Sequence, residues 1–139
     1  MSNIEQTLSI IKPDAVERNL SGKIQEIFLK NNLKILNQKK LQISKDEAAE
    51  FYSVHQSKSF FGSLCSYLSS GPIIVMVLEG ENAILKNREL MGSTDPKEAK
   101  PNTIRKMYGI SIDKNSVHGS DSLENAKKEI NFFFKNSWN

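Results

Sequence analysis

The sequence contains one cysteine, Cys65, and only two histidines. A lone cysteine cannot form an internal disulfide, so a reducing, cytoplasmic location is expected. No apolar run approaches the roughly 18 residues that a membrane span requires. The first twelve residues, MSNIEQTLSIIK, also lack the basic start and the long apolar stretch of a secretory signal. These absences favour a soluble protein with no membrane association.

Several sequence signatures of phosphate binding are missing as well. There is no G-x-x-x-x-G-K-[ST] loop, no G-x-G-x-x-G turn, and no HRD or DFG element of the protein kinases. Cys65 and two distant histidines do not make a zinc site. The net charge of +3 is too small to indicate nucleic acid as a partner. Any phosphate-bearing ligand must therefore be held by side chains from several segments.

The composition is that of a folded globular protein. The chain has 139 residues, of which 38% are hydrophobic and 25% charged. This length is sufficient for a hydrophobic core and typical of one domain. Because no repeat, low-complexity block or linker divides the sequence, we expect a single domain over residues 1–139.

The hydrophobic pattern predicts an α+β fold. Strands are expected at residues 7–11, 33–43 and 73–78, with a short final strand that reaches His118. Residues 73–78 are the most apolar run and are expected to form a central strand covered on both faces. Helices are expected after Ser21, after Ser44 and over residues 60–69, 82–91, 104–107 and 123–134. This order favours a ferredoxin-like βαββαβ sandwich: a four-stranded antiparallel sheet with added helices, covered mainly on one face, and a long loop over residues 93–115.

The last predicted helix suggests a partner for His118. Helical spacing places one set of apolar residues on its buried side: Leu123, Ala126, Ile130 and Phe133. Glu129 lies at the edge of that stripe, and a half-covered carboxylate needs a partner. A glutamate bonded to one imidazole nitrogen would fix the tautomer and leave the other nitrogen free to react.

A purely structural interpretation of His118 is also open. A histidine before a helix is commonly a surface or capping residue, and Asp121 with Glu124 could form a capping box without it. His55 receives only this structural interpretation, because no residue near it suggests chemistry.

Cationic residues gather in and beside the long loop. Arg88 precedes the segment with Thr94, and Arg105 follows Thr103. Guanidinium groups form paired, charge-assisted hydrogen bonds to phosphate oxygens, so this set suits an oligophosphate. Lys12, just past the first strand, could also donate to phosphate or sugar oxygens. The alternative is a solvated loop with ordinary surface cations.

Four motifs in order give the chain a resemblance to the nucleoside diphosphate kinases over nearly its whole length. The most specific is Asn115-x-x-His118-Gly119-Ser120-Asp121. The others are Thr7-Leu8-x-Ile10-Ile11-Lys12-Pro13-Asp14, Gly92-x-Thr94-x-Pro96 and Thr103-Ile104-Arg105. The resemblance implies transfer of a terminal phosphoryl group from a nucleoside triphosphate to a nucleoside diphosphate, by a ping-pong mechanism through a phosphohistidine.

The resemblance implies catalytic roles for five residues. His118 would be the nucleophile, through Nδ1, while Glu129 holds the opposite ring nitrogen and Ser120 anchors that carboxylate. Tyr52 would lie beside the transferring group. Lys12 would contact sugar hydroxyls and nearby phosphate oxygens.

It also implies the remaining nucleotide contacts. Asn115 would act with Lys12, and the β and terminal phosphates would be held by Arg88, Thr94 and Arg105. Phe60 would stack on the base, in a slot lined by Leu64 and Ile112.

The resemblance further implies a cofactor and an assembly. Mg²⁺ would be held mainly by the nucleotide phosphates, with no metal site in the protein. Ribo- and deoxyribonucleotides would both serve as substrates, and the chain would form a homo-oligomer, with a hexamer favoured over a tetramer. Asn102 and Lys106 depart from the family pattern in the loop that builds phosphate and subunit contacts; an asparagine still tolerates left-handed backbone.

A binding module of the same fold is the rival hypothesis. Ferredoxin-like sheets bind RNA through aromatic residues on their strands, and the predicted strands carry no such pattern. Nucleic acid is therefore not indicated as a partner.

Overall fold

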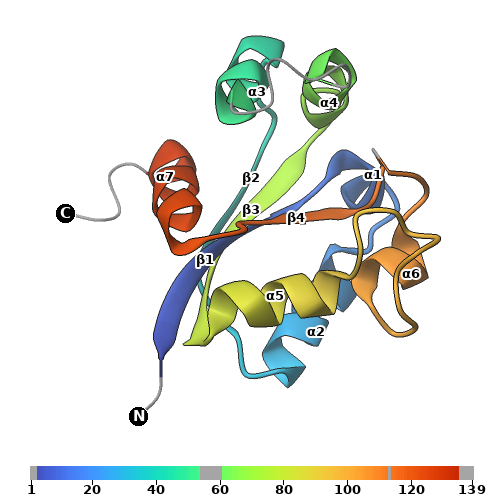
Figure 1. Ribbon diagram of the computed structural model, residues 1–139. Coiled ribbons are helices and arrows are strands. Elements are labelled where there is room, and N and C mark those ends of the chain that lie inside the picture. Colours follow the sequence, from blue (N-terminus) through green and yellow to red (C-terminus); the bar gives the residue numbers. More distant parts are fainter. Residues whose placement is uncertain (1–2, 54–60, 113, 135–139) are drawn as a thin grey trace.

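The fold is built on one four-stranded antiparallel sheet (Figure 1). The computed structural model describes residues 3–53, 61–112 and 114–134. The strand order is β2-β3-β1-β4, with bounds β1 Ile4–Ile11, β2 Lys34–Leu41, β3 Ile73–Glu81 and β4 Val117–Gly119. All three strand pairs are antiparallel. The predicted α+β, ferredoxin-like class is confirmed, and the apolar run at 73–78 lies on a central strand as expected.

Seven helices surround the sheet in the part of the chain that the structure describes. Their bounds are α1 Pro13–Glu17, α2 Ser21–Lys30, α3 Lys45–Phe51, α4 Phe61–Leu68, α5 Ala83–Met91, α6 Ile104–Tyr108 and α7 Leu123–Phe133. The predicted capping box of α3 is present: the Ser44 hydroxyl accepts from the Glu47 amide, and the Glu47 carboxylate accepts from the Ser44 amide. Helix α1 was not expected. Pro13 ends β1 but also begins a helix, since the first helical position needs no amide donor.

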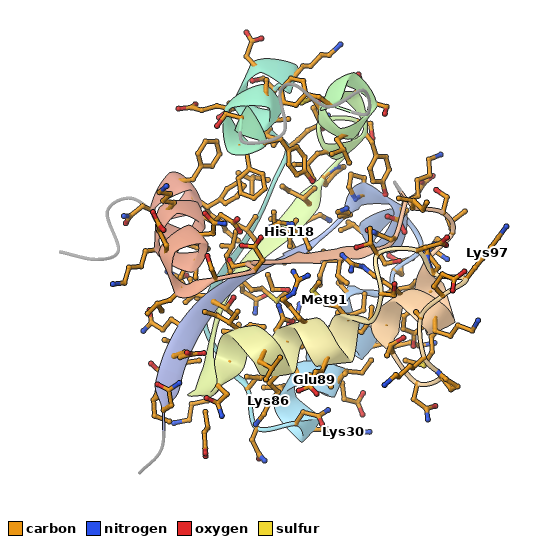
Figure 2. All side chains as sticks on the ribbon, in the orientation of Figure 1. Lys30, Lys86, Glu89, Met91, Lys97 and His118 are labelled. Carbon is orange, nitrogen blue, oxygen red and sulfur yellow. The ribbon has the colours of Figure 1, made fainter. Side chains whose placement is uncertain are left out.

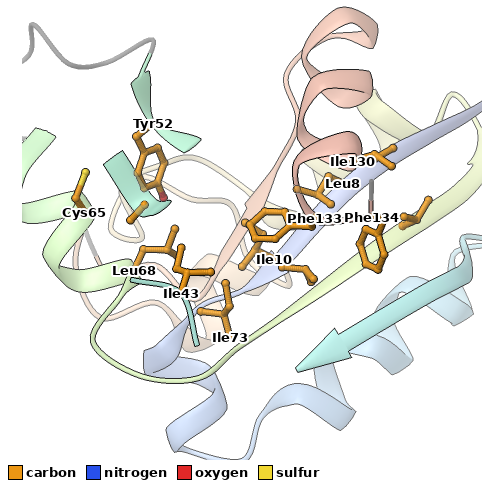
Figure 3. Close-up of a cluster of buried hydrophobic side chains, with 13 residues drawn as sticks. Leu8, Ile10, Ile43, Tyr52, Cys65, Leu68, Ile73, Ile130, Phe133 and Phe134 are labelled. Atoms are coloured by element: carbon orange, nitrogen blue, oxygen red, sulfur yellow. The ribbon is translucent and has the colours of Figure 1, made fainter. Parts of the chain in front are cut away.

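The sheet is covered on both faces, so the expectation of a sheet covered mainly on one face was wrong. Alternate residues of β3 point to opposite sides, and both sets are buried. One set packs under α3, α4 and α7 in the cluster of Figure 3. The other packs against α1, α2, α5 and α6. Figure 1 shows these two helical layers on either side of the strands.

Helix α7 corrects two details of the sequence analysis. Its N-cap is Ser122, whose hydroxyl accepts from the Asn125 amide at 3.1 Å, and not Asp121. Leu123 is 50% exposed, because the first turn extends beyond the sheet-facing stripe. The remaining predicted stripe is buried: Ala126, Ile130 and Phe133.

Strand β4 lies directly on α5 through a glycine. A Cβ at Gly119 would meet Asn87 Nδ2 at 2.3 Å and Met91 Sδ at 2.7 Å, both closer than van der Waals contact. Because side chains alternate along a strand, the preceding residue, His118, points to the opposite face. Figure 2 shows His118 and Met91 on opposite sides of β4. The close packing at Gly119 therefore fixes the distance between α5 and the strand that carries His118.

We expect Gly119→Ala to lower the free energy of unfolding by about 1–3 kcal/mol, because the added methyl group overpacks this contact. Urea denaturation measures the change. The Asn87 amide has no hydrogen-bond partner among the described residues, so Asn87→Ala frees space without breaking a recorded bond. The double variant should regain part of the lost stability. Wild-type stability in Gly119→Ala would contradict the proposed contact.

Candidate active site

His118 and Glu129 form the centre of the site. His118 lies in the middle of β4, paired with Ile10 of β1, and Glu129 comes from α7. His118 Nε2 lies 2.8 Å from Glu129 Oε1, and the Ser120 hydroxyl donates to the same oxygen at 2.9 Å. The side chains of His118 and Glu129 are 21% and 19% exposed. With Nε2–H bonded to the carboxylate, the neutral ring keeps its lone pair on Nδ1.

Aromatic rings fix the orientation of the imidazole from α3. Phe51 lies edge to face with His118 at a centroid distance of 5.3 Å, and Tyr52 lies 6.5 Å away at 84°. Tyr52 is therefore beside the histidine. Phe51 was missed, because an aromatic residue on the apolar face of a helix gives the same sequence signal as an ordinary core residue.

A lysine and an asparagine join the end of β1 to the long loop. Lys12 Nζ donates to Asn115 Oδ1 at 2.9 Å, and Asn115 Nδ2 donates to the Thr94 carbonyl at 3.0 Å. Lys12 and Asn115 are only 5% and 2% exposed. A lysine this buried is held in place by its partners, so its charge has a defined position.

Arg105 is a buried guanidinium held by backbone carbonyls. It donates from Nη1 to Gly92 O and from Nη2 to Val117 O, both at 3.0 Å. Burial, and secondarily the positive charge of Arg88, lowers the pKa of Arg105 to about 10, so it remains protonated at neutral pH. Gly92 has a φ of 87°, and a Cβ there would meet the Thr103 hydroxyl at 2.5 Å. That glycine lets the loop close tightly over the arginine.

These residues line one cleft of about 1090 Å³, a size that suits a nucleotide. The predicted site residues on its wall are Lys12, Tyr52, Leu64, Arg88, Thr94, Arg105, Ile112, Asn115, His118 and Glu129. Ser120 is fully buried behind Glu129. Phe60 and His55 lie outside the described residues. Asn102 has a φ of 68°, so the loop keeps a left-handed residue at this departure from the family pattern.

Asp121 and Asn125 also line the cleft, and the sequence analysis gave them no role there. Asn125 Nδ2 donates to Asp121 Oδ1 at 2.6 Å, and this hydrogen bond is the main cause that lowers the pKa of the Asp121 carboxyl. The spacing of four residues was the available signal. The described residues contain no group of three or more His, Cys, Asp or Glu side chains that could hold a metal ion. None of the helices described is both long and apolar enough to span a membrane.

Known proteins of one family match this chain. The sequence model described as nucleoside diphosphate kinase matches residues 5–138. The nucleoside diphosphate kinase of Nitratiruptor sp. is 63% identical over 94% of this chain and 96% of its own length. That of Wolinella succinogenes is 60% identical, with the same coverage.

Solved structures agree. The nucleoside diphosphate kinase of Aquifex aeolicus superposes with a TM-score of 0.93 at 44% identity, over 95% of this chain and 96% of that one. The Halobacterium salinarum enzyme, solved in complex with CDP, gives 0.92 at 39% identity, over 96% and 90%. The chain therefore belongs to the nucleoside diphosphate kinase family, and it is a phosphotransferase that acts on nucleoside phosphates.

Proposed function

We propose that His118 Nδ1 carries the phosphoryl group between the two nucleotides. The observation that supports this most directly is the hydrogen bond of 2.8 Å between Nε2 and Glu129. It commits one ring nitrogen to the protein, and no described residue hydrogen-bonds to the other. An imidazole oriented by a second group is the usual arrangement for an activated nucleophile.

The reaction then has two half-reactions of the same kind. In the first, the Nδ1 lone pair forms a bond to the terminal phosphorus, and the bond from that phosphorus to the bridging oxygen breaks, so a nucleoside diphosphate leaves. In the second, a terminal oxygen of another nucleoside diphosphate attacks the phosphohistidine, and the N–P bond breaks. Glu129 balances the positive charge that develops on the ring while Nδ1 is phosphorylated.

Cations around the cleft hold the phosphates in line with His118. Arg105 supplies N–H groups from a side chain already fixed by two carbonyls, and Arg88 and Lys12 add positive charge. Thr94 and Tyr52 add hydroxyl groups. Phosphoryl transfer depends mostly on positioning and on charge stabilisation, so a preorganised cationic wall fits this reaction.

The nucleoside would occupy the opposite end of the cleft. Leu64 and Ile112, which line the cleft, would form that part, and Ile112 is 56% exposed. Phe60 remains the proposed stacking partner for the base. Stacking contributes about 1–3 kcal/mol per base with little regard to base identity, which suits both ribo- and deoxyribonucleotides. The complex of the Halobacterium salinarum relative with CDP supports a nucleotide here.

Mg²⁺ is proposed to arrive with the nucleotide. The ion would be held mainly by the phosphate oxygens, since Mg²⁺ prefers oxygen ligands and is commonly bound through substrate phosphates. Such an ion would neutralise phosphate charge during transfer. The protein's part is to bind and align the resulting complex through Lys12, Arg88 and Arg105.

The chain is proposed to act as one catalytic domain over residues 1–139, in the cytoplasm, within a homo-oligomer. Exposed apolar side chains on neighbouring elements support an interface: Leu29 of α2 is 57% exposed and Leu36 of β2 is 48% exposed. Light scattering on the purified protein should give six times the chain mass of 15.7 kDa. A mass of four chains would favour the tetramer and contradict the hexamer.

Incubation with [γ-³²P]ATP should label the protein, and the label should be acid-labile and base-stable, as expected for a phosphohistidine. His118→Ala should take up no label and should lose exchange between ATP and dTDP, while circular dichroism reports an unchanged fold. Label persisting in this variant would place the nucleophile elsewhere. Exchange activity of the wild type also separates the enzyme from a binding module with an idle site.

Glu129→Gln should lower kcat on the order of 10²-fold, because a neutral amide no longer balances the charge of the phosphorylated ring. Ser120→Ala should lower kcat only about 5–10-fold, the value of one hydrogen bond. Because Ser120 acts through Glu129, Ser120→Ala in the Glu129→Gln background should add less than its separate effect. Full additivity in steady-state kinetics would show that the two residues act independently.

A further inference from the structure

Asp14 is a buried carboxylate that does not line the cleft. It lies on α1, with its side chain 4% exposed. Its Oδ2 accepts from the Ser116 hydroxyl at 2.9 Å and from Arg18 Nη2 at 3.0 Å, and its Oδ1 accepts from the Tyr67 hydroxyl. The most distant donor, Ser116, lies 102 residues from Asp14 in the sequence. A charge with this many partners fixes the relative positions of the segments that provide them.

Ser116 is the first of the three donors to Asp14. It is fully buried and has a φ of 76°, a left-handed conformation that is unfavourable for a non-glycine residue. Its neighbour Asn115 is bonded to Lys12 Nζ, and its own carbonyl accepts from the Lys12 amide at 2.8 Å. His118 follows two residues later. The bond from Ser116 to Asp14 therefore holds the turn that leads into the catalytic strand.

Tyr67 is the second donor to Asp14. It lies on α4, one turn after Leu64, which lines the cleft and is proposed to contact the nucleoside. Its hydroxyl donates to the Asp14 carboxylate and accepts from the Asp14 amide at 2.8 Å. Burial, followed by the hydrogen bond to Asp14, raises the pKa of Tyr67, so the phenol remains a donor. One carboxylate thus joins α4, which contributes Leu64 to the cleft, to the turn that precedes β4.

Arg18 is the third donor to Asp14. Its Nη2 bonds to the Tyr108 carbonyl at 2.6 Å, and its Nε bonds to the Asp14 carbonyl at 3.0 Å. The end of α6, which carries Arg105, is thereby tied to the same carboxylate. Asp14 has no place of its own on the cleft wall, so its effect on the substrate must pass through these neighbours.

We infer that Asp14 is a positioning residue that couples α4 to the segment 115–118, so that the nucleoside slot and the Lys12–Asn115 pair keep a fixed separation. The inference rests on the proposed use of the cleft by a nucleotide. Without the coupling, Ser116 relaxes from its left-handed backbone and α4 moves independently. The nucleotide then binds less well, while His118 keeps Glu129 and the reactive step changes little.

The test compares single hydroxyl removals. Tyr67→Phe should raise the KM for both nucleotides about 3–10-fold with kcat within twofold of the wild type. Ser116→Gly removes the other hydroxyl without a left-handed penalty and should show the same division between KM and kcat. Tyr108→Phe is the matched control, because the Tyr108 hydroxyl makes no hydrogen bond in the described part of the chain; its KM should not change.

Double variants show whether the effects pass through Asp14. In an Asp14→Asn background, Tyr67→Phe should change KM less than twofold further. An unchanged KM in a folded Tyr67→Phe enzyme, or full additivity in a folded Asp14→Asn background, would overturn the inference. If Asp14→Asn does not fold, the KM of the single variant Tyr67→Phe alone tests the inference. Labelling of the wild type by [γ-³²P]ATP separates the two proposals, since absence of label contradicts the role of His118 and an unchanged KM contradicts only the role of Asp14.

Discussion

The hydrogen bond between the Glu129 carboxylate and His118 Nε2 is the interaction on which the site depends. It assigns the two ring nitrogens to different tasks, because a proton held on Nε2 leaves the lone pair on Nδ1. It also links β4 to α7, two elements that reach the site from different directions. Ser120 secures the carboxylate, and its hydroxyl accepts from the Leu8 amide of β1 at 3.3 Å. The central sheet thus sets the orientation of the His118 imidazole through Ser120 and Glu129.

The sheet positions the remaining groups in two ways. Side chains alternate between its two faces, and Lys12 follows directly after a strand ends. His118 points to one face, and Gly119 lies against α5 on the other. Lys12 follows the last residue of β1, whose partner in β4 is Val117. The carbonyl of that same Val117 holds Arg105. His118 and two of the cations proposed to hold phosphate, Lys12 and Arg105, are therefore all positioned by the pairing of β1 with β4.

Local pattern predicted much of this arrangement, and its failures have physical causes. Apolar runs and capping residues located the strands and the helices after α1. The spacing of Glu129 from Phe133 correctly placed a half-covered carboxylate near His118. Helix α1 was missed because Pro13 can end a strand and begin a helix with the same geometry. The second apolar layer was missed although the run at 73–78 indicated a strand buried on both faces.

Contacts between distant segments had no sequence signal. Asp14 meets Ser116 and Tyr67 only because the end of β1, the start of β4 and the end of α4 lie near one another. A sequence gives the residue types of such a network but not their distances. The resemblance to a family supplied the nucleotide contacts that periodicity could not, and these contacts stay predictions.

Strand β4, which carries His118, is the shortest of the four strands, with three residues at one edge of the sheet. An edge strand bonded on one side opens at a lower free energy than a central strand does. Sub-global opening of β4 would carry the imidazole away from its cationic wall while β1 and β3 stay paired. Heat would then inactivate the enzyme at a lower temperature than the one at which the sheet melts. The circular dichroism signal that remains after heating would therefore overestimate the fraction of enzyme that is still active.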